Sequence, residues 1–124
     1  MNKIIKIILF LVFTFSIVPE SLLANNKIKI GLLVPLTGKN SEIGQSIIKS
    51  ARLAINTINN ISIEIIPKDT QSNPDITLRA AKELANAGIK IVIGPVFNES
   101  LIYLDELNEL TFLSLTNKND NFSK

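Results

Sequence analysis

The side chains in this 124-residue chain that could do chemistry are hydroxyls, amides and carboxylates, because the sequence contains neither histidine nor cysteine. Without these two residue types, the chain has no Ser-His triad, no cysteine nucleophile and no thiolate or imidazole metal site. Asp69 and Asp75 form a candidate carboxylate pair, but the helix dipole already explains an aspartate at an expected helix start such as Asp75. We therefore predict no catalytic residue, no metal and no cofactor, and we do not expect an enzyme.

Polar side chains instead follow two apolar runs, at the points where strands are expected to end. The residues are Thr37 and Ser41 after the first run, and Phe97, Asn98 and Ser100 after the run that ends at Ile93. Backbone N–H groups at helix starts near Ser41 and Asn98 would favour a carboxylate, phosphate or sugar oxygen. Alternatively, Ser41 and Asn98 only cap their helices, and Phe97 is explained as well by the core as by the wall of a cleft.

Nucleotide and nucleic-acid functions are not supported by the sequence. Gly38 and Lys39 resemble part of a phosphate loop, but the spacing G-x-x-x-x-G-K-[ST] is not met, and no G-x-G-x-x-G follows the first apolar run. The net charge is only +2, from 13 basic and 11 acidic residues, and no basic stripe is present. Without that electrostatic footprint we expect no binding to nucleic acid.

The elements that must position the polar turns alternate along the chain. Strands are expected at residues 28–34, 61–66, 89–93 and 112–115, with Pro67 ending the second. Helices are expected from 41 to 59, from 74 to about 87 and from 98 to about 110. The expected N-caps are Ser41, Asn73 and Asn98, and Gly88 is expected just after the second helix. This alternation predicts an α/β fold with an open parallel sheet and helices on both faces.

The strand order expected for this sheet is 2-1-3-4. Because crossovers between parallel strands are right-handed, the first must leave strand one in one direction and the next must return past it. The order reverses between strands one and three, and open α/β sheets bind ligands beyond the carboxyl ends of the strands at such a point. The candidate site is therefore the edge where the turns at residues 36–41 and 96–100 meet.

Residues 1–24 resemble a secretory signal peptide. Lys3 and Lys6 precede an apolar run at residues 7–18, which is shorter than the roughly 20 residues that a membrane helix needs. Cleavage is expected after Ala24, although Leu22 stands where a small residue is preferred, and an uncleaved N-terminal anchor is the alternative. We therefore expect a periplasmic domain at residues 25–124 that folds without disulfides.

Five segments in a fixed order resemble type I periplasmic binding proteins. The segments are IKIGLLVPLTG, EIGQSIIKSARLAIN, IEIIPKDT with NPDITLRAAKEL, AGIKIVIGPVFNES and FLSLTN. The broad resemblance is to the leucine-binding-protein-like branch, across residues 28–118. Within it, VPLTG, PKDT, GPVF and LSLTN are most similar to penicillin-binding protein activators, exported proteins whose binding-protein-like domain helps to regulate a cell-wall synthase.

The resemblance implies a ligand site made by the turns after strands three and four. In amino-acid-binding members, the turn after strand three gives a hydroxyl and backbone amides to the ligand carboxylate, which places Asn98 at or near that position and Ser100 one turn later. The stretch after strand four, which holds the ligand in those members, reads Thr116-Asn117-Lys118 here. Lys118 is a poor partner for an ammonium group, which favours the activator-like branch or an anionic ligand.

The resemblance also implies two lobes around a hinge, of which residues 25–124 correspond to an incomplete N-terminal lobe. With the second lobe missing, we expect this lobe to bind a small molecule weakly or not at all, since it can bury only part of the ligand's surface. The expected function is that of an activator of a cell-wall synthase. The alternative is a solute receptor for branched-chain or other amino acids, with an ABC-transporter permease as partner.

Overall fold

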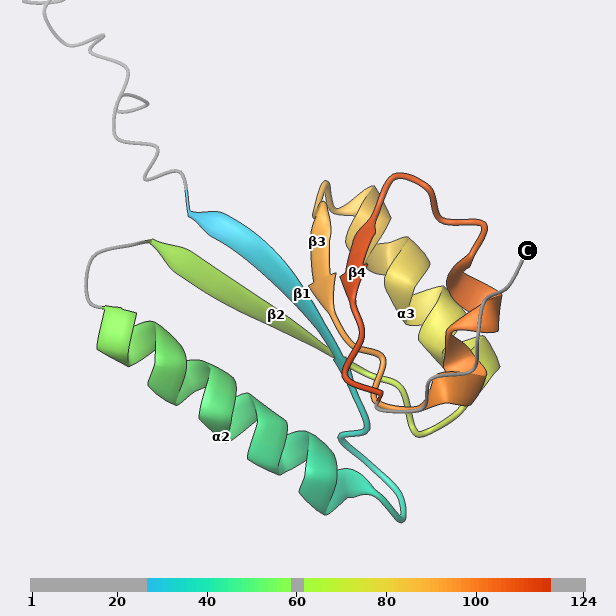
Figure 1. Ribbon diagram of the computed structural model, residues 1–124, viewed down its shortest axis with the longest axis horizontal. Coiled ribbons are helices and arrows are strands. Elements are labelled where there is room, and N and C mark those ends of the chain that lie inside the picture. Colours follow the sequence, from blue (N-terminus) through green and yellow to red (C-terminus); the bar gives the residue numbers. More distant parts are fainter. Residues whose placement is uncertain (1–26, 59–61, 117–124) are drawn as a thin grey trace, which may run out of the picture.

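Four parallel strands form one sheet in the residues that the computed structural model describes, 27–58 and 62–116 (Figure 1). The strands are β1 (Ile28–Val34), β2 (Ile63–Asp69), β3 (Ile91–Ile93) and β4 (Thr111–Leu113). Their order is β2-β1-β3-β4, and every pairing is parallel. The predicted α/β class and strand order are therefore confirmed, while the predicted signal peptide at residues 1–24 lies outside the described residues.

Helices cover both faces of the sheet, as predicted. The helix α2 (Ser41–Ile58) lies on one face, and α3 (Pro74–Asn86) lies on the other with the short 3-10 helices η2 (Asn98–Ser100) and η3 (Ile102–Leu104) (Figure 1). Successive strand residues point to opposite faces. In β1, Leu33 therefore joins the core on the α3 side, whereas Leu32 and Val34 join the core on the α2 side. No helix among residues 27–58 and 62–116 is long and apolar enough to cross a membrane.

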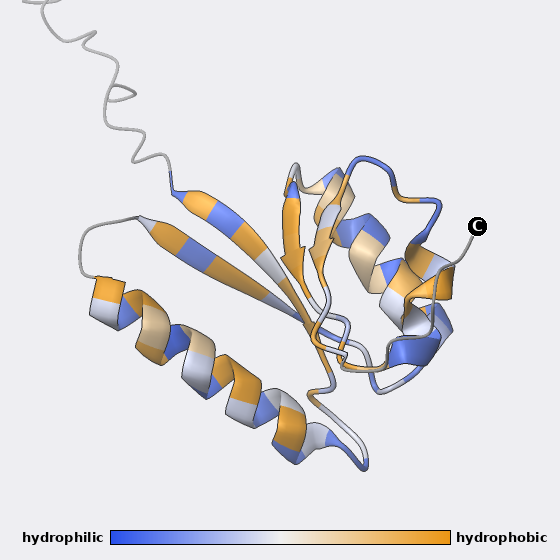
Figure 2. Ribbon diagram, in the orientation of Figure 1, coloured by the Kyte–Doolittle hydropathy of each residue, from blue (hydrophilic) through white to orange (hydrophobic). Residues whose placement is uncertain are grey.

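The two faces of the sheet are covered unequally. The α2 helix packs against β1 and β2, and within the described residues it makes no comparable contact with β3 or β4. On that side of the sheet, Ile91 in β3 is 40% exposed and Leu113 in β4 is 54% exposed. Figure 2 shows hydrophobic residues along β3 and β4, away from α2. The α3 side, in contrast, holds the larger buried core.

The prediction of an α-helix from residue 98 to about residue 110 is wrong, because this segment forms 3-10 helices and turns. Its backbone N–H groups bond to the carbonyl three residues earlier, from Leu104 to Leu101, Leu107 to Leu104 and Leu110 to Leu107, with N···O distances of 2.9, 3.0 and 3.2 Å. A spacing of three matches the 3-10 helix, which has three residues per turn. Leu104, Leu107 and Leu110 thereby all reach the core on the α3 side. An α-helix would rotate successive members of this series away from one another.

The boundaries of three strands also differ from the prediction. Strand β2 continues through Pro67 to Asp69, which is possible because, within the described residues, β2 lies at the edge of the sheet and pairs with β1 alone. Strand β3 begins at Ile91, because the N–H of Ile89 closes the end of α3 by donating to Leu84 O at 3.1 Å. Strand β4 covers residues 111–113 and pairs with β3 along its whole length.

The helix caps confirm the prediction for α3 and correct it for α2. Asn73 is the N-cap of α3, accepting from the Ile76 N–H at 3.0 Å, with Pro74 at the first helical position. Gly88 follows the helix with φ +78°, a left-handed conformation that favours glycine. Ser41, in contrast, is the first residue within α2, and its N–H donates to Gly38 O at 3.2 Å.

Candidate functional site

The turns that follow the strands gather at the carboxyl edge of the sheet, shown at the bottom of Figure 1. Val34 and Asp69 are register partners at the ends of β1 and β2. On the other side, Gly94 N donates to Leu113 O at 2.9 Å and Leu115 N donates to Pro95 O at 3.1 Å, which ties the turn after β3 to the one after β4. The structure therefore brings the turns predicted to form the site to one edge.

Asp69, the last residue of β2, holds the turn between β1 and α2. One carboxylate oxygen, Oδ1, accepts from the N–H groups of Leu36, Gln71 and Thr37 at 2.7, 2.9 and 3.3 Å. The other, Oδ2, accepts from the Thr37 hydroxyl at 2.6 Å. Thr37, which is predicted from the sequence to bind a ligand, thus donates its hydroxyl proton to Asp69. Its oxygen can act towards a ligand only as a hydrogen-bond acceptor.

The environment of Asp69 favours its ionised form. Burial of the carboxyl by itself raises its pKa, but the hydrogen bonds from the Thr37 hydroxyl and from the N–H groups of Leu36, Gln71 and Thr37 together outweigh burial and lower the pKa below its usual range. Hydrogen bonds to a carboxylate stabilise the charge because every donor points its positive end at the oxygens. Asp69 is therefore negatively charged at neutral pH.

The turn after β2 carries two residues in a left-handed conformation. Gln71 and Ser72 have φ values of 51° and 57°, which side chains other than glycine, asparagine and aspartate adopt at a cost. The bond from Gln71 N–H to Asp69 and the bond from Asn40 Nδ2 to Ser72 Oγ, at 3.0 Å, hold this turn against the start of α2. The β1 and β2 ends are thus locked together.

The turn after β3 contains the predicted residues Phe97, Asn98 and Ser100. Phe97 and Asn98 are half-buried, and Ser100 is 3% exposed. The Ser100 hydroxyl donates to Thr77 Oγ1 at 3.3 Å, and the Thr77 hydroxyl donates to Asn73 O at 2.8 Å. Ser100 therefore anchors the turn to α3 and offers almost no surface to a ligand.

Several of the N–H donors predicted at the two helix starts are used within the chain. Ile43 N–H donates to Asn40 O at 3.1 Å, and Ser100 N–H donates to Phe97 O at 3.2 Å. After β4, half-buried Thr116 donates its N–H to Ser114 Oγ at 3.2 Å, and Asn117 lies outside the described residues. Because the N–H groups of Ile43 and Ser100 already donate to carbonyl groups within the chain, the two helix starts form a weaker anion site than the sequence predicts.

A hollow of about 240 Å³ lies elsewhere, on the α3 side of the sheet. It is lined by Leu101, Leu104, Asp105 and Phe112, none of which is a predicted ligand residue. Its volume falls below the roughly 300 to 1,000 Å³ of ordinary ligand pockets, and three of its four lining residues are apolar. Among residues 27–58 and 62–116, no group of acidic side chains could hold a metal ion. The carboxyl edge remains the candidate site.

Two residues of this edge have roles that the sequence does not predict. Asp69, at the end of β2, accepts hydrogen bonds from the turn after β1 and from the turn after β2, and Thr77 is the buried partner of Ser100. An aspartate at the end of a strand, in the segment PKDT, is a signal for the first. Thr77 carries no such signal, because a threonine one turn into a helix is ordinary.

The comparison with protein families decides the family. The sequence model of the family described as periplasmic binding protein matches residues 27–117. The chain belongs to the periplasmic binding protein family. Members of this family are binding proteins, and membership implies a location outside the cytoplasm. The comparison with curated protein sequences finds no significant match.

Solved structures of binding proteins share the fold of this periplasmic binding protein. The solute-binding protein of an ABC transporter from Rhodopseudomonas palustris BisB5, in complex with 3,4-dihydroxybenzoic acid, is 26% identical, with a TM-score of 0.67 over 73% of this chain and 27% of that one. The leucine-binding protein LivK from Thermotoga maritima has a TM-score of 0.66 at 19% identity, over 73% and 28% of the two chains.

A third match belongs to a regulator. The C-domain of LpoA from Haemophilus influenzae, a regulator of PBP1A, is 28% identical, with a TM-score of 0.56 over 69% of this chain and 27% of that one. The chain thus spans about a quarter of the length of each of these structures. Both receptors and an activator occur among the similar proteins, and the resemblance to both branches is confirmed.

Proposed function

We propose that residues 25–124 belong to a non-catalytic, exported binding domain of the penicillin-binding protein activator type, which regulates a cell-wall synthase by contact. The observation that carries this proposal is the internal use of hydroxyls expected to hold a ligand, since Thr37 donates to Asp69 and Ser100 donates to Thr77. An edge whose hydroxyls are engaged suits a fixed contact surface better than a closing ligand site. The 28% identity to the LpoA domain supports the same role.

Export by a signal peptide cleaved after Ala24 is part of this proposal. Its support is the positively charged start and the apolar run within residues 1–24, together with the family membership. N-terminal sequencing of the protein from envelope fractions tests it. A chain that starts at Asn25 agrees with cleavage, whereas a chain that starts at Met1 contradicts it.

Affinity capture from envelope extract with the full chain as bait tests the activator role. We expect recovery of a cell-wall synthase, and we expect Lys39→Glu to weaken it, because Lys39 is an exposed residue of the turn at the carboxyl edge. Lys49→Glu, on the exposed surface of α2, makes the same charge change away from that edge and is the matched control. Failure to recover a synthase would argue against this role.

A solute receptor for an ABC transporter is the second candidate function. It is favoured by the larger structural similarity to receptors, with TM-scores of 0.67 and 0.66 against 0.56 for the LpoA domain. The ligand would then contact those predicted residues of the carboxyl edge that keep some exposed surface, namely Thr37, Ser41, Phe97, Asn98 and Thr116. A rise in melting temperature with leucine, isoleucine or 3,4-dihydroxybenzoate, without capture of a synthase, would support the receptor and its permease as partner.

A further inference from the structure

The donor cluster at the end of β1 is already occupied by a negative charge. Both oxygens of Asp69 accept hydrogen bonds, from the N–H groups of Leu36, Thr37 and Gln71 and from the Thr37 hydroxyl, at 2.6 to 3.3 Å. Leu36 and Thr37 are consecutive, and the N–H groups of both donate to the same oxygen, Asp69 Oδ1. Consecutive N–H groups of this kind form concavities that bind anions.

No cation neutralises this carboxylate in the described part of the chain. The ion pairs found there join Lys68 to Glu83 and Lys82 to Glu106, and neither includes Asp69. The charge is instead held by backbone and hydroxyl dipoles, as a bound carboxylate or phosphate would be. Asp69 therefore occupies the position that an external anion would take.

We propose that Asp69 is an internal anion that fills the donor cluster of the β1–α2 turn. This turn forms one wall of the carboxyl edge, and the charge of Asp69 closes that wall to anionic ligands. A second negative group at about 4 Å from the carboxylate would be repelled, and it would find these N–H groups already used. The wall therefore accepts neutral or cationic groups, such as a donor to the Thr37 oxygen. The inferred selectivity for a ligand rests on the proposed use of this edge as a binding surface. The occupation of the donor cluster by Asp69 does not depend on that proposed function.

Chemical rescue tests the filling of the cluster. In the full chain, Asp69→Ala removes the carboxylate and keeps the four donors, and formate supplies the missing atoms. We expect Asp69→Ala to lower the melting temperature by several degrees, and sodium formate to restore part of this loss saturably, beyond the effect of sodium chloride at equal ionic strength. The wild type, whose cluster is occupied, should respond equally to both salts.

Glu83→Ala is the matched control for this rescue. Glu83 is an exposed carboxylate that pairs with Lys68 at 2.6 Å and receives no backbone donors among the described contacts. Formate should therefore stabilise Glu83→Ala no more than chloride does. Equal stabilisation of Asp69→Ala by the two salts, or specific stabilisation of the wild type by formate, would overturn the proposal.

Asp69→Asn keeps the proposal testable if Asp69→Ala does not fold. The amide retains one oxygen acceptor for the Leu36 and Gln71 N–H groups but carries no charge. We expect this variant to fold, to show no specific response to formate, and to lose the fall in stability that wild type shows as Asp69 takes up a proton in acid. A variant that keeps the wild-type pH profile would overturn the internal-anion role.

An NMR titration separates this inference from the proposed function. If an anionic probe such as acetate shifts the Leu36 and Thr37 amide signals of wild type saturably, the wall is open to anions and the inference fails, although the edge binds ligands. If these signals do not respond in wild type but do respond in Asp69→Ala, the inference holds even when no synthase and no solute ligand is found. The two proposals can therefore fail independently.

Discussion

At the scale of single residues, the carboxyl edge depends on two polar contacts that connect distant parts of the chain. The Asp69 carboxylate joins the end of β2 to the turn after β1, and the buried Ser100 hydroxyl joins the turn after β3 to α3. A charge-assisted hydrogen bond contributes more to stability than a neutral one, so the two contacts should differ in size and in pH dependence.

Asp69→Asn should lower the stability of the protein at neutral pH by roughly 1.5 to 3 kcal/mol, the range for hydrogen bonds to charged groups. The folded-state pKa of Asp69 is lowered, so its contribution is fully present above the unfolded pKa of about 3.9 and is lost as pH falls through the folded value. Denaturant titrations from pH 7 to pH 2.5 measure this. The gap between wild type and variant should narrow below about pH 4, and a constant gap would contradict the assignment.

Thr77→Val should destabilise the protein more than Ser100→Ala. Removing the Ser100 hydroxyl loses one neutral hydrogen bond, worth about 1 kcal/mol, whereas Thr77→Val leaves Ser100 buried without its acceptor, at roughly 1 to 3 kcal/mol. Thr57→Val is the control, because Thr57 makes the same bond to the carbonyl four residues earlier on the exposed surface of α2. Chemical denaturation of the three variants gives the comparison, and equal losses at Thr77 and Thr57 would contradict it.

At the scale of elements, the position of α2 depends on the absence of a side chain. Gly44 is buried in the first turn of α2, and an added Cβ would lie 1.8 Å from Pro35 O in the turn after β1. The obstacle is backbone, which cannot swing aside as a flexible side chain can. The close approach of Gly44 to Pro35 O therefore sets how near α2 lies to the turn that carries Thr37.

Gly44→Ala should cost about 3 kcal/mol or more, because α2 must move off the sheet to relieve the clash. Gln45→Ala, at the neighbouring exposed position of the same helix, should change stability by less than about 0.5 kcal/mol. Thermal and denaturant unfolding of both variants provide the measurement. A Gly44→Ala protein as stable as Gln45→Ala would mean that α2 does not pack on the turn as closely as described.

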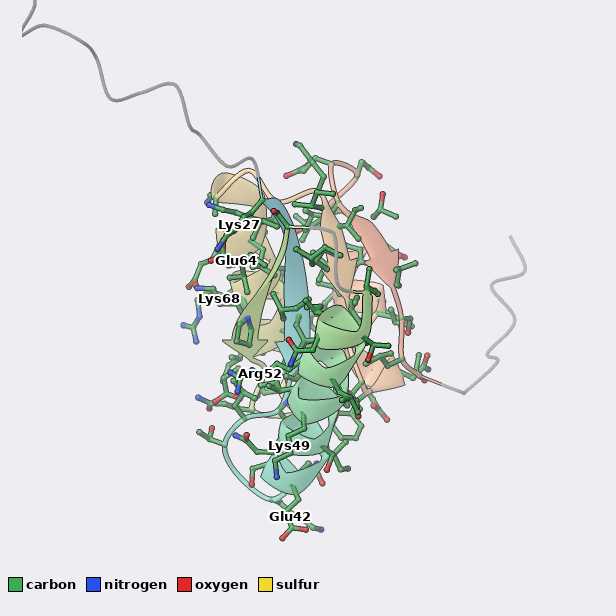
Figure 3. All side chains as sticks on the ribbon, turned by 90° about the vertical axis from the view of Figure 1, so that its left-hand side faces the viewer. Lys27, Glu42, Lys49, Arg52, Glu64 and Lys68 are labelled. Carbon is green, nitrogen blue, oxygen red and sulfur yellow. The ribbon has the colours of Figure 1, made fainter. Side chains whose placement is uncertain are left out.

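At the scale of the whole molecule, the two edges of the described sheet are protected unequally. The β2 edge carries Glu64, Pro67 and Lys68, and Figure 3 shows Glu64 and Lys68 along it. Charged residues and proline on an edge strand discourage pairing with another strand. The β4 edge has no charge within residues 111–113, and Leu113 is 54% exposed. Among the described residues, β4 is therefore the edge open to association.

Leu113→Lys should reduce concentration-dependent association of the full chain without unfolding it. The side chain is already half exposed, so little burial is lost, and the added charge opposes edge pairing. Leu53→Lys is the control, because Leu53 is 68% exposed and belongs to the helix α2 instead of a strand. Light scattering over a range of concentrations should show a smaller mass for Leu113→Lys only. Equal effects of both changes would indicate general solubility instead of edge pairing.

The sequence alone determined the layers and the order of the sheet, because these depend on local periodicity, helix caps and the hand of crossovers. Asn73 with Pro74, and the buried run ending at Val34, predict their elements from near neighbours. The 3-10 segment is harder to predict from near neighbours, because the spacing of Leu104, Leu107 and Leu110 fits an α-helix almost as well as a 3-10 helix.

Only the tertiary structure decided which polar groups of the edge remain available to a ligand. The partners of Thr37 and Ser100 are Asp69 and Thr77, which lie 32 and 23 residues away in the sequence. The type of a side chain gives the bonds it can make, but which bond forms depends on distances set by the packed sheet. The location of the candidate site therefore follows from the sequence, whereas the polar groups that it offers follow from the tertiary structure.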